Sequence, residues 1–289
     1  MISGVINLLK PPGMTSHDAV SFIRRVYGQK QVGHAGTLDP AAAGVLPVFL
    51  GRATRLVEYL AEDDKQYRVE LRFGQETDSG DDTGNVIRTS ELIPDSEAVR
   101  RSLASLLGQG SQIPPMHSAI KIGGRKLYEL ARQGLVVERK PRPITIYAIS
   151  LLQMSGDCAL FDVVCSKGTY IRTLCAEIGL RCQSAATMTF LLRGRVGECR
   201  LEKAVSLEEI SNNPLQAIEP ADLLLTKLPE LLLSGSDAAR FLNGQKINAA
   251  STAESDATHR VYDPDGIFIG IAKIDGDTLI PQKVFLPDV

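Results

Sequence analysis

Strict alternation of apolar and charged residues marks the stretch Gln66–Phe73. Its apolar residues share one face of an extended chain and its charged residues share the other, which is typical of a half-buried strand. A similar alternation predicts strands over Arg142–Gln153 and Leu160–Cys165. Two short runs in which apolar residues dominate, Gly4–Leu9 and Val45–Leu50, predict further strands with more complete burial.

Helices are predicted where a capping residue precedes a run with apolar residues on one side. The first begins at Thr15 or Ser16 and reaches about Tyr27. Glycines at Gly108 and Gly134 provide two of the expected helix ends. The other predicted helices cover Thr54–Leu60, Pro94–Leu107, Lys126–Gln133 and a stretch that follows Ser166–Thr173 and reaches Leu180.

The periodic pattern breaks between Gly33 and Asp39. From Gly33 to Arg55 the chain holds four glycines and two prolines but a single carboxylate, Asp39. Pro40 disfavours a helical conformation for the residue before it, so Asp39 is expected to be extended. We therefore predict a shaped loop up to Asp39, without helix or strand, anchored by the buried run Val45–Leu50. A rigid loop of this kind suits a catalytic carboxylate, although a turn in which Asp39 caps backbone amides is an alternative.

Composition and the absence of certain motifs exclude several classes of function. The five cysteines contain no Cys-x-x-Cys pair, so neither disulfides nor a zinc site is expected. No phosphate-binding loop or dinucleotide fingerprint is present. The acids of Gly74–Asp82 lack the spacing of a calcium loop, and this polar stretch is expected to be a solvated loop. Since no apolar run approaches a membrane span and the start of the chain lacks a secretory pattern, we expect a cytoplasmic location.

Charge is unevenly distributed along the chain. The net charge of −2 gives no overall sign of nucleic-acid binding. Between Lys121 and Arg142, however, seven basic residues stand against two acidic ones. Such a patch fits either contact with a phosphate backbone or a solvated helix face.

A second charge difference predicts a domain boundary. Residues 1–228 carry 27 basic and 25 acidic residues, a net charge of +2, whereas residues 229–289 carry 5 and 9, a net charge of −4. Three prolines also fall in Pro214–Pro229, and together these features place the boundary near Lys227. Beyond it, Asp263–Gly266 is a good hairpin turn between alternating stretches.

Several motifs resemble one known family. Gly33–Arg55 is similar to the catalytic motif of the bacterial tRNA pseudouridine-55 synthases, the TruB family, and contains the pattern G-H-x-G-x-L-D-P. Lys10–Ser16 resembles the family's K-P-x-G-x-T-S signature, and Cys165–Thr173 its C-S-K-G-T-Y-I-R-T motif. Phe190–Val196 is similar to a family strand with the pattern L-R-R-x-x-x-G, in which Leu192 replaces the first arginine.

This resemblance implies an architecture. The implied fold is α+β, the pseudouridine synthase fold with a mixed, mainly antiparallel sheet, plus a small β-rich, PUA-like C-terminal domain. The catalytic domain would cover 1–227 and the C-terminal domain 228–289. An insertion at 113–143 would form a thumb that grips RNA, with His117 in place of the family's aromatic residue.

The resemblance also implies roles for individual residues. Asp39 would be the essential carboxylate, Arg172 its ion-pair partner, and Tyr67 the ring that stacks on the target base and takes a proton from C5. The implied substrate contacts are His34, Tyr170, Leu191, Lys10 and Lys167. The implied RNA contacts in the thumb are Lys121, Arg125, Lys126 and Arg132.

Without the resemblance, four of these residues have simpler interpretations. Tyr67 fits the core face of its strand, and Arg172 fits a surface position at the start of a helix. Lys10 fits a lysine held at a strand end, and His34 a loop histidine bonded to backbone. For Lys10 the two interpretations are equally well supported by the sequence.

The implied function is isomerisation of the T-loop uridine at position 55 of tRNA to pseudouridine, by a flipped-base, aspartate-dependent mechanism. The base leaves C1′ through N1 and returns through C5, so no atom is gained or lost and no cofactor or metal is expected. The expected partner is the T arm of tRNA, bound by a monomer. The alternatives are an RNA-binding or RNA-folding protein without activity, and a carbohydrate hydrolase, which usually needs two carboxylates.

Overall fold

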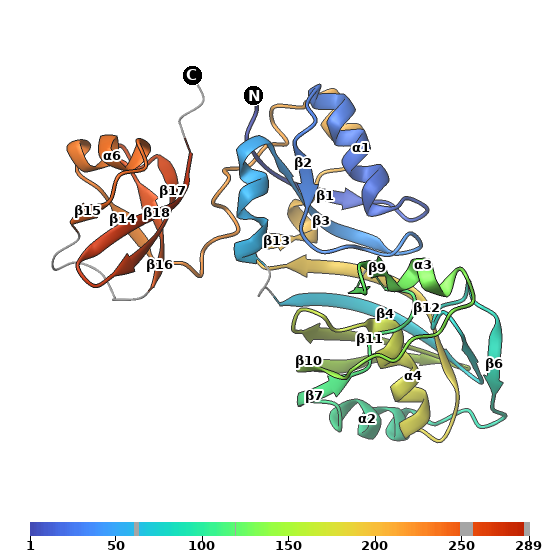
Figure 1. Cartoon of the computed structure of the whole chain (residues 1–289). Coiled ribbons are helices and arrows are strands. Elements are labelled where there is room, and N and C mark those ends of the chain that lie inside the picture. Colours follow the sequence, from blue (N-terminus) through green and yellow to red (C-terminus); the bar gives the residue numbers. More distant parts are fainter. Residues whose placement is uncertain (61–63, 119, 249–256, 286–289) are drawn as a thin grey trace.

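A nine-stranded sheet forms the larger part of this computed structural model, which describes residues 1–60, 64–118, 120–248 and 257–285 (Figure 1). Its strands are β1 (Gly4–Lys10), β2 (Val32–His34), β3 (Ala43–Leu50), β4 (Lys65–Phe73), β7 (Gly108–Gln112), β10 (Arg142–Ser155), β11 (Cys158–Cys165), β12 (Ala186–Val196) and β13 (Cys199–Arg200). The order is β1-β3-β12-β4-β11-β10-β7, with β2 beside β3 and β13 beside β12. Within the described part of this sheet, β3 and β12 are the parallel pair and the other neighbours are antiparallel, which confirms the mixed, mainly antiparallel prediction.

Strand β4 shows why the alternating pattern forms a sheet. Its apolar residues, from Tyr67 to Phe73, are all buried, while Arg68 and Arg72 on the opposite face are exposed. Helices α2 (Ser96–Ala104) and α4 (Ile171–Arg181) pack against the buried face. Each fully buried Val, Leu or Phe side chain stabilises the fold by about 1.5–3 kcal/mol. This packing sets the position of α4, which begins beside the candidate site.

Helix α1 (Ser16–Tyr27) begins where the capping pattern predicts. Thr15 and Asp18 form a reciprocal capping box at its start, and Gly28, with φ of 60°, ends it. The predicted helix at Thr54–Leu60 is also present, but as a 3₁₀ helix, η1 (Gly51–Leu60), that begins three residues earlier. Gly51 allows this because its φ is +56° and its Cα passes close to the residues before β1, where a Cβ would lie 2.4 Å from the carbonyl oxygen of Ile2.

The prediction of an irregular loop from Gly33 onwards is wrong for its first two residues. Gly33 and His34 belong to β2, where they pair with Phe49 and Val48 of β3. Pairing with β3 satisfies backbone groups that would otherwise lack partners in a partly buried position. The loop without helix or strand begins at Ala35 and runs through Asp39.

The expectation of a solvated loop at Gly74–Asp82 is wrong in part, because only Asp78 and Asp82 of this stretch are exposed. Residues in this stretch form β5 (Gln75–Thr77), which pairs with β6 (Val86–Thr89) as a hairpin. The side chains of Thr77 and Ser79 are buried. Polar residues enter the interior here because their hydroxyls have partners: each donates to the carbonyl of Asp81.

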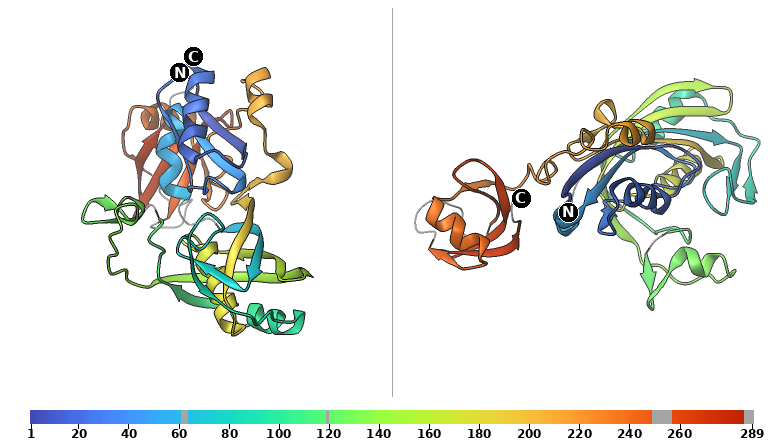
Figure 2. Two further views of the ribbon diagram at one scale, coloured as in Figure 1. Left: turned by 90° about the vertical axis from the view of Figure 1, so that its right-hand side faces the viewer. Right: turned by 90° about the horizontal axis from the view of Figure 1, so that it is seen from above.

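The residues between β7 and β10 stand away from the large sheet, as the view from above in Figure 2 shows. They form a short hairpin, β8 (Lys121–Ile122) and β9 (Arg125–Lys126), followed by helix α3 (Leu127–Ala131). The hairpin turn is Gly123-Gly124, and both glycines have positive φ, 57° and 82°. Tight hairpin turns require such angles, so the Gly-Gly pair was a hairpin signal in the sequence.

The C-terminal residues form a second sheet, as predicted, in the order β14-β16-β17-β18-β15. Its elements are β14 (Glu230–Leu232), α6 (Gly235–Leu242), β15 (Ile247–Asn248), β16 (Thr258–Tyr262), β17 (Phe268–Asp275) and β18 (Thr278–Val284). The connection to it carries η2 (Leu201–Lys203) and α5 (Leu207–Asn212). The predicted turn joins β16 to β17, where Asp263 Oδ1 accepts hydrogen bonds from the N–H groups of Asp265 (3.0 Å) and Ile267 (2.9 Å). Residues 249–256 and 286–289, and residue 119 of the predicted thumb, lie outside the described residues.

The second sheet contacts the first through apolar and charged side chains. Phe285 belongs to the same buried cluster as Phe49 and Leu56 of the N-terminal half. Beside this cluster, Lys283 Nζ lies 2.7 Å from Glu58 Oε1. The two sheets are therefore joined both by the connecting segment that carries η2 and α5 and by direct packing of side chains.

Two further expectations can be compared with the structure. All five cysteines are free thiols and four of them are buried, as their lack of paired spacing predicted. None of the described helices is long and apolar enough to span a membrane.

Candidate active site

The backbone around Asp39 is held by a continuous series of hydrogen bonds. The five successive carbonyls of Gly36–Pro40 each accept at least one hydrogen bond. Leu38 is held twice, since Ser16 Oγ accepts from its N–H at 2.9 Å and donates to its carbonyl at 3.0 Å. The N–H of Ala42 donates to the carbonyl of Asp39 at 3.1 Å. The carboxylate is therefore carried on a loop whose shape exists before any substrate arrives.

Lys10 contacts the Asp39 loop from the interior of the protein. Its side chain is fully buried at the end of β1. Its Nζ donates to the carbonyls of Met14 at 2.6 Å, Pro11 at 2.7 Å and Pro40 at 3.3 Å. Burial, and secondarily the charge of Arg193, lower the pKa of Lys10 to about 8. These contacts match the interpretation of a lysine held at a strand end, and they join the first turn of the chain to the Asp39 loop.

Arg193, in β12, was not selected by the sequence reasoning, yet its side chain is only 1% exposed. Its Nε donates to the carbonyl of Val45 at 2.7 Å, Nη1 to that of Thr37 at 3.2 Å and Nη2 to that of Gly36 at 3.0 Å. The signal that could have found it was its place in the L-R-R-x-x-x-G pattern, where Arg193 follows the buried Leu191 by two residues and matches the second arginine.

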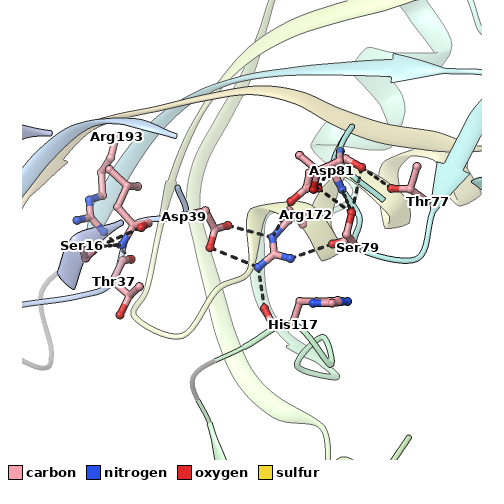
Figure 3. A network of polar contacts seen from close by, with 11 residues as sticks. Ser16, Thr37, Asp39, Thr77, Ser79, Asp81, His117, Arg172 and Arg193 are labelled. Atoms are coloured by element: carbon pink, nitrogen blue, oxygen red, sulfur yellow. Dashed lines mark hydrogen bonds and ion pairs between the residues drawn. The ribbon is translucent and has the colours of Figure 1, made fainter. Parts of the chain in front are cut away.

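Asp39 forms a two-pronged ion pair with Arg172, which the sequence places 133 residues away (Figure 3). Arg172 Nε lies 3.0 Å from Asp39 Oδ2, and Nη2 lies 3.5 Å from Oδ1. The guanidinium is buried, with 8% of its side chain exposed, whereas 35% of the Asp39 side chain is exposed. The carboxylate is thus oriented from the protein side and remains accessible from outside.

The other donors of Arg172 are also used. Nη1 donates to the carbonyl of Ser79 at 2.9 Å, and Nη2 to the carbonyl of His117 at 2.8 Å. Asp81 Oδ2 lies 3.9 Å from Arg172 Nε, so a second carboxylate faces the same guanidinium. Sequence reasoning missed Ser79 and Asp81 because their stretch was interpreted as a solvated loop. The alternation of hydroxyl and acid from Thr77 to Asp81 was the available signal.

Tyr67 lies beside Arg193 in the sheet, because the two residues are register partners in β4 and β12. Its side chain is buried, and burial raises its pKa to about 12, while a hydrogen bond and the charge of Arg193 act in the opposite direction. Tyr67 also belongs to the same buried cluster as Leu38 and Ile171, which are the chain neighbours of Asp39 and Arg172. The structure therefore brings Asp39, Arg172 and Tyr67 to one region.

The predicted substrate contacts are distributed around this region. Leu191 is buried in β12, and Tyr170 precedes α4, where its N–H donates to Gln112 Oε1 at 2.9 Å and its carbonyl accepts from Gln112 Nε2 at 3.4 Å. His34, in β2, is half-buried, and burial lowers its pKa. Its Nδ1 is buried and has no hydrogen-bond partner among the described residues, so this nitrogen is not bonded to backbone.

Lys167 is placed differently from the other predicted contacts. It is exposed and lines a separate hollow of about 350 Å³, together with Tyr147 and Ser166. Neither Asp39 nor Arg172 lines that hollow. The structure does not bring Lys167 into the cluster around the carboxylate.

The predicted RNA contacts surround one aromatic ring of the hairpin and helix that follow β7. Lys126 Nζ and Arg132 Cζ each lie 5.4 Å from the centre of the Tyr128 ring. Lys121 and Arg125 are exposed on the adjacent strands. The segment that carries these cations contacts the site through His117, whose carbonyl accepts the hydrogen bond from Arg172 Nη2. Within the described ranges no cluster of three metal-ligating side chains occurs.

Comparison with known proteins identifies the family. The family model for the N-terminal domain of TruB family pseudouridylate synthases matches residues 24–171. The model for the C-terminal domain of pseudouridine synthase II TruB matches residues 229–285. The chain belongs to the TruB family. It is a pseudouridine synthase, an isomerase whose relatives act on tRNA.

Individual TruB-family relatives cover nearly the whole chain. The tRNA pseudouridine synthase B of Caldanaerobacter subterraneus subsp. tengcongensis is 43% identical over 98% of this chain and 99% of its own. That of Clostridium perfringens is 41% identical over 99% and 100%. Among solved structures, the crystal structure of a Cbf5–Nop10–Gar1 complex matches with a TM-score of 0.77 and 26% identity, over 98% of this chain and 85% of that one. The predicted pseudouridine synthase fold is therefore confirmed, with a TruB-type C-terminal domain.

Proposed function

We propose that this TruB-family enzyme isomerises the T-loop uridine at position 55 of tRNA, with Asp39 as the essential carboxylate. The observation that carries the proposal is the two-pronged Asp39–Arg172 ion pair on a loop in which every carbonyl from Gly36 to Pro40 accepts a hydrogen bond. Such a pair presents one oriented carboxylate to a bound base, and pre-oriented groups of this kind provide much of the rate enhancement of enzymes.

The reaction conserves every atom of the uridine. The bond from N1 to C1′ breaks, the uracil turns, and C5 joins C1′, after which the proton on C5 leaves and a proton is bound at N1. Three roles fit Asp39: attack on C1′, attack on C6 of the ring, or removal of a ribose proton. Tyr67 is proposed to stack on the base and to relay the C5 proton: its oxygen accepts that proton as its own O–H proton passes on to solvent or to N1, with Arg172 holding the carboxylate throughout.

A folded T loop must release the uridine before Asp39 can reach it. Flipping a base costs a few kcal/mol, and stacking on an aromatic ring returns about 1–3 kcal/mol. We propose that Tyr67, Tyr170 and Leu191 line the uracil site and that His34, whose Nδ1 is unpaired among the described residues, holds the displaced bases. Lys10 acts on substrate only through the Asp39 loop, since its Nζ is occupied by three carbonyls.

The remaining parts of the chain are assigned in the same proposal. Residues 1–227 form the catalytic domain, with the insertion 113–143 as a thumb on the T arm, and 228–289 form the C-terminal domain. The exposed cations near Tyr128 support contact with phosphates. We propose a monomer that works in the cytoplasm and holds one tRNA at a time.

The replacement Asp39→Asn tests the proposal, because asparagine keeps the shape of the side chain but removes its charge. We expect pseudouridine formation in a tRNA transcript to disappear, while tRNA binding stays within about threefold of the wild-type value because RNA affinity comes mainly from phosphate contacts. The product is measured by chemical mapping of pseudouridine, and binding by filter retention.

A transcript with cytidine at position 55 serves as the matched control and should yield no product. Product at another uridine of that transcript would contradict the assigned position. Near-normal turnover by Asp39→Asn would contradict the assigned carboxylate. A wild-type chain that binds tRNA but never forms pseudouridine would support the RNA-binding alternative.

A further inference from the structure

Arg193 is a buried cation with an unusual set of partners. Its side chain is 1% exposed, and within the described residues its guanidinium contacts backbone carbonyls but no carboxylate. Burying a charge is unfavourable unless the charged group is fully hydrogen-bonded. Here the hydrogen bonds go to the two ends of a single loop, the one that carries Asp39.

The three acceptors lie on both sides of Asp39 in the chain. The carbonyls of Gly36 and Thr37 precede it, at 3.0 and 3.2 Å from Nη2 and Nη1, and that of Val45 follows it in β3, 2.7 Å from Nε. Because the three nitrogens are fixed in one plane, they set the spacing between the two ends of the loop. A lysine ammonium is a point donor and cannot span the same acceptors.

The same side chain also reaches the strand that carries Tyr67. Tyr67 and Arg193 are register partners in neighbouring strands, and the positive charge of Arg193 acts on the phenol, whose pKa it lowers against the larger effect of burial. On its other side the backbone of Arg193 passes very close to Gly44, where a Cβ would lie 2.2 Å from the Arg193 carbonyl oxygen. Arg193 therefore has little freedom to move relative to β3 or β4.

We infer that Arg193 is a positioning residue of the isomerisation, which fixes the Asp39 loop relative to the strand that carries Tyr67. The inference rests on the proposed function of Asp39 and Tyr67. In Figure 3 Asp39 lies between the Arg193 and Arg172 side chains. Arg172 orients the carboxylate directly, whereas Arg193 acts on the backbone behind it and does not touch substrate.

The experiment compares Arg193→Lys and Arg193→Gln with the wild-type chain in single-turnover assays, with enzyme in excess over tRNA. Arg193→Lys keeps the positive charge but loses the planar set of donors that reaches both ends of the loop. Arg193→Gln loses both the charge and this set of donors. Since a displacement of about 1 Å can reduce a rate by about 10²-fold, we expect the rate of both variants to fall by about that factor. The Kd for tRNA should stay within about threefold, because phosphate contacts determine it.

Arg195→Lys is the matched control. Arg195 lies two residues further along β12, with Nη2 2.7 Å from Asp64 Oδ2 and no contact with the Asp39 loop among the described residues. The single-turnover rate of the Arg195→Lys variant should stay within about twofold of the wild-type rate, because substitutions outside a functional network usually have small effects. A double-mutant cycle with Tyr67→Phe adds a second readout: the tyrosine substitution should reduce the rate less in the Arg193→Lys background than in the wild type.

The outcomes separate this inference from the proposed function. A wild-type chain that forms no pseudouridine refutes the proposed function itself. An active wild type with Arg193 variants of near-normal rate refutes the positioning role alone. Circular dichroism measures the folded fraction, so that rates refer to folded enzyme. Failure of both variants to fold would also overturn the inference, because Arg193 would then be required for folding as such.

Discussion

The charged side chains of the site differ in their exposure to solvent. Asp39 keeps 35% of its side chain exposed, whereas Lys10, Arg172 and Arg193 are all buried. Arg172 orients the carboxylate directly, whereas Lys10 and Arg193 hold the backbone of its loop from the buried side. This arrangement explains how one small carboxylate can be placed accurately without crowding its substrate.

Lys10 gives the site a predictable pH dependence. Its pKa is about 8 in the folded chain, against an ordinary value of 10.5, so the ammonium is lost as the pH rises above 8. A neutral amine has only two N–H donors for three carbonyls, and the Asp39 loop loosens. We expect the single-turnover rate to fall about tenfold for each pH unit above 8, in step with the remaining ammonium.

Stability should change in the opposite direction over this range. Between pH 8 and 10.5 the unfolded chain binds more protons at Lys10 than the folded chain does, so this residue makes folding more favourable as the pH rises. Lys10→Arg is the control, because arginine stays protonated and any titration of the RNA affects both enzymes equally. Identical pH profiles for the two enzymes would show that the charge of Lys10 does not act on the rate.

Among the elements, those with a local pattern could be predicted and those formed by distant pairing could not. Strand β4 and helix α1 follow from alternation and capping within a few residues. Strand β7 (GQGSQ) has no apolar pattern of its own and is extended because β10 pairs with it. The Asp39–Arg172 pair joins residues 133 positions apart, so only the family resemblance pointed to it. The contacts of Asp81 and Arg193 were missed because their partners are backbone groups and side chains far away in the sequence.

The hairpin and helix between β7 and β10 provide a prediction at this scale. Replacing Lys121, Arg125 and Lys126 together by glutamine removes three cations from an exposed surface. We expect weaker tRNA binding and a smaller dependence on salt, with the slope of log K against log[salt] reduced by about 1 for each lost phosphate contact. Binding is measured by titration at several salt concentrations.

A matched variant carries glutamine at Arg68, Arg72 and Arg100, which are exposed on β4 and α2. It changes the net charge by the same amount but leaves the hairpin intact. Its salt slope should equal that of the wild type. If the hairpin variant and the wild type have equal salt slopes, the hairpin does not contact the phosphates of the RNA.

The two large sheets of the described molecule share an apolar cluster. Phe285 follows the last strand of the second sheet and is 5% exposed, within a cluster that includes Phe49 of the first sheet. Large-to-small substitutions at packed aromatic positions cost about 3–5 kcal/mol. We expect Phe285→Ala to separate the unfolding of the two sheets into two transitions in differential scanning calorimetry.

Phe190→Ala is the comparison, since Phe190 lies on β12 with 45% of its side chain exposed. Its calorimetric trace should resemble that of the wild type, because little apolar surface is lost from the interior. If Phe285→Ala also gives a wild-type trace, the contact between the sheets contributes little to stability.

The strand order has a consequence for synthesis of the chain. β12 lies in the middle of the large sheet, between β3 and β4, yet it is translated after nearly every other strand of that sheet. A nascent polypeptide that ends before residue 186 therefore lacks the strand that joins its two halves. One of those halves carries Asp39 and the other carries Arg172. Contacts so distant in sequence form slowly. The enzyme becomes competent only after the ribosome has released this late strand.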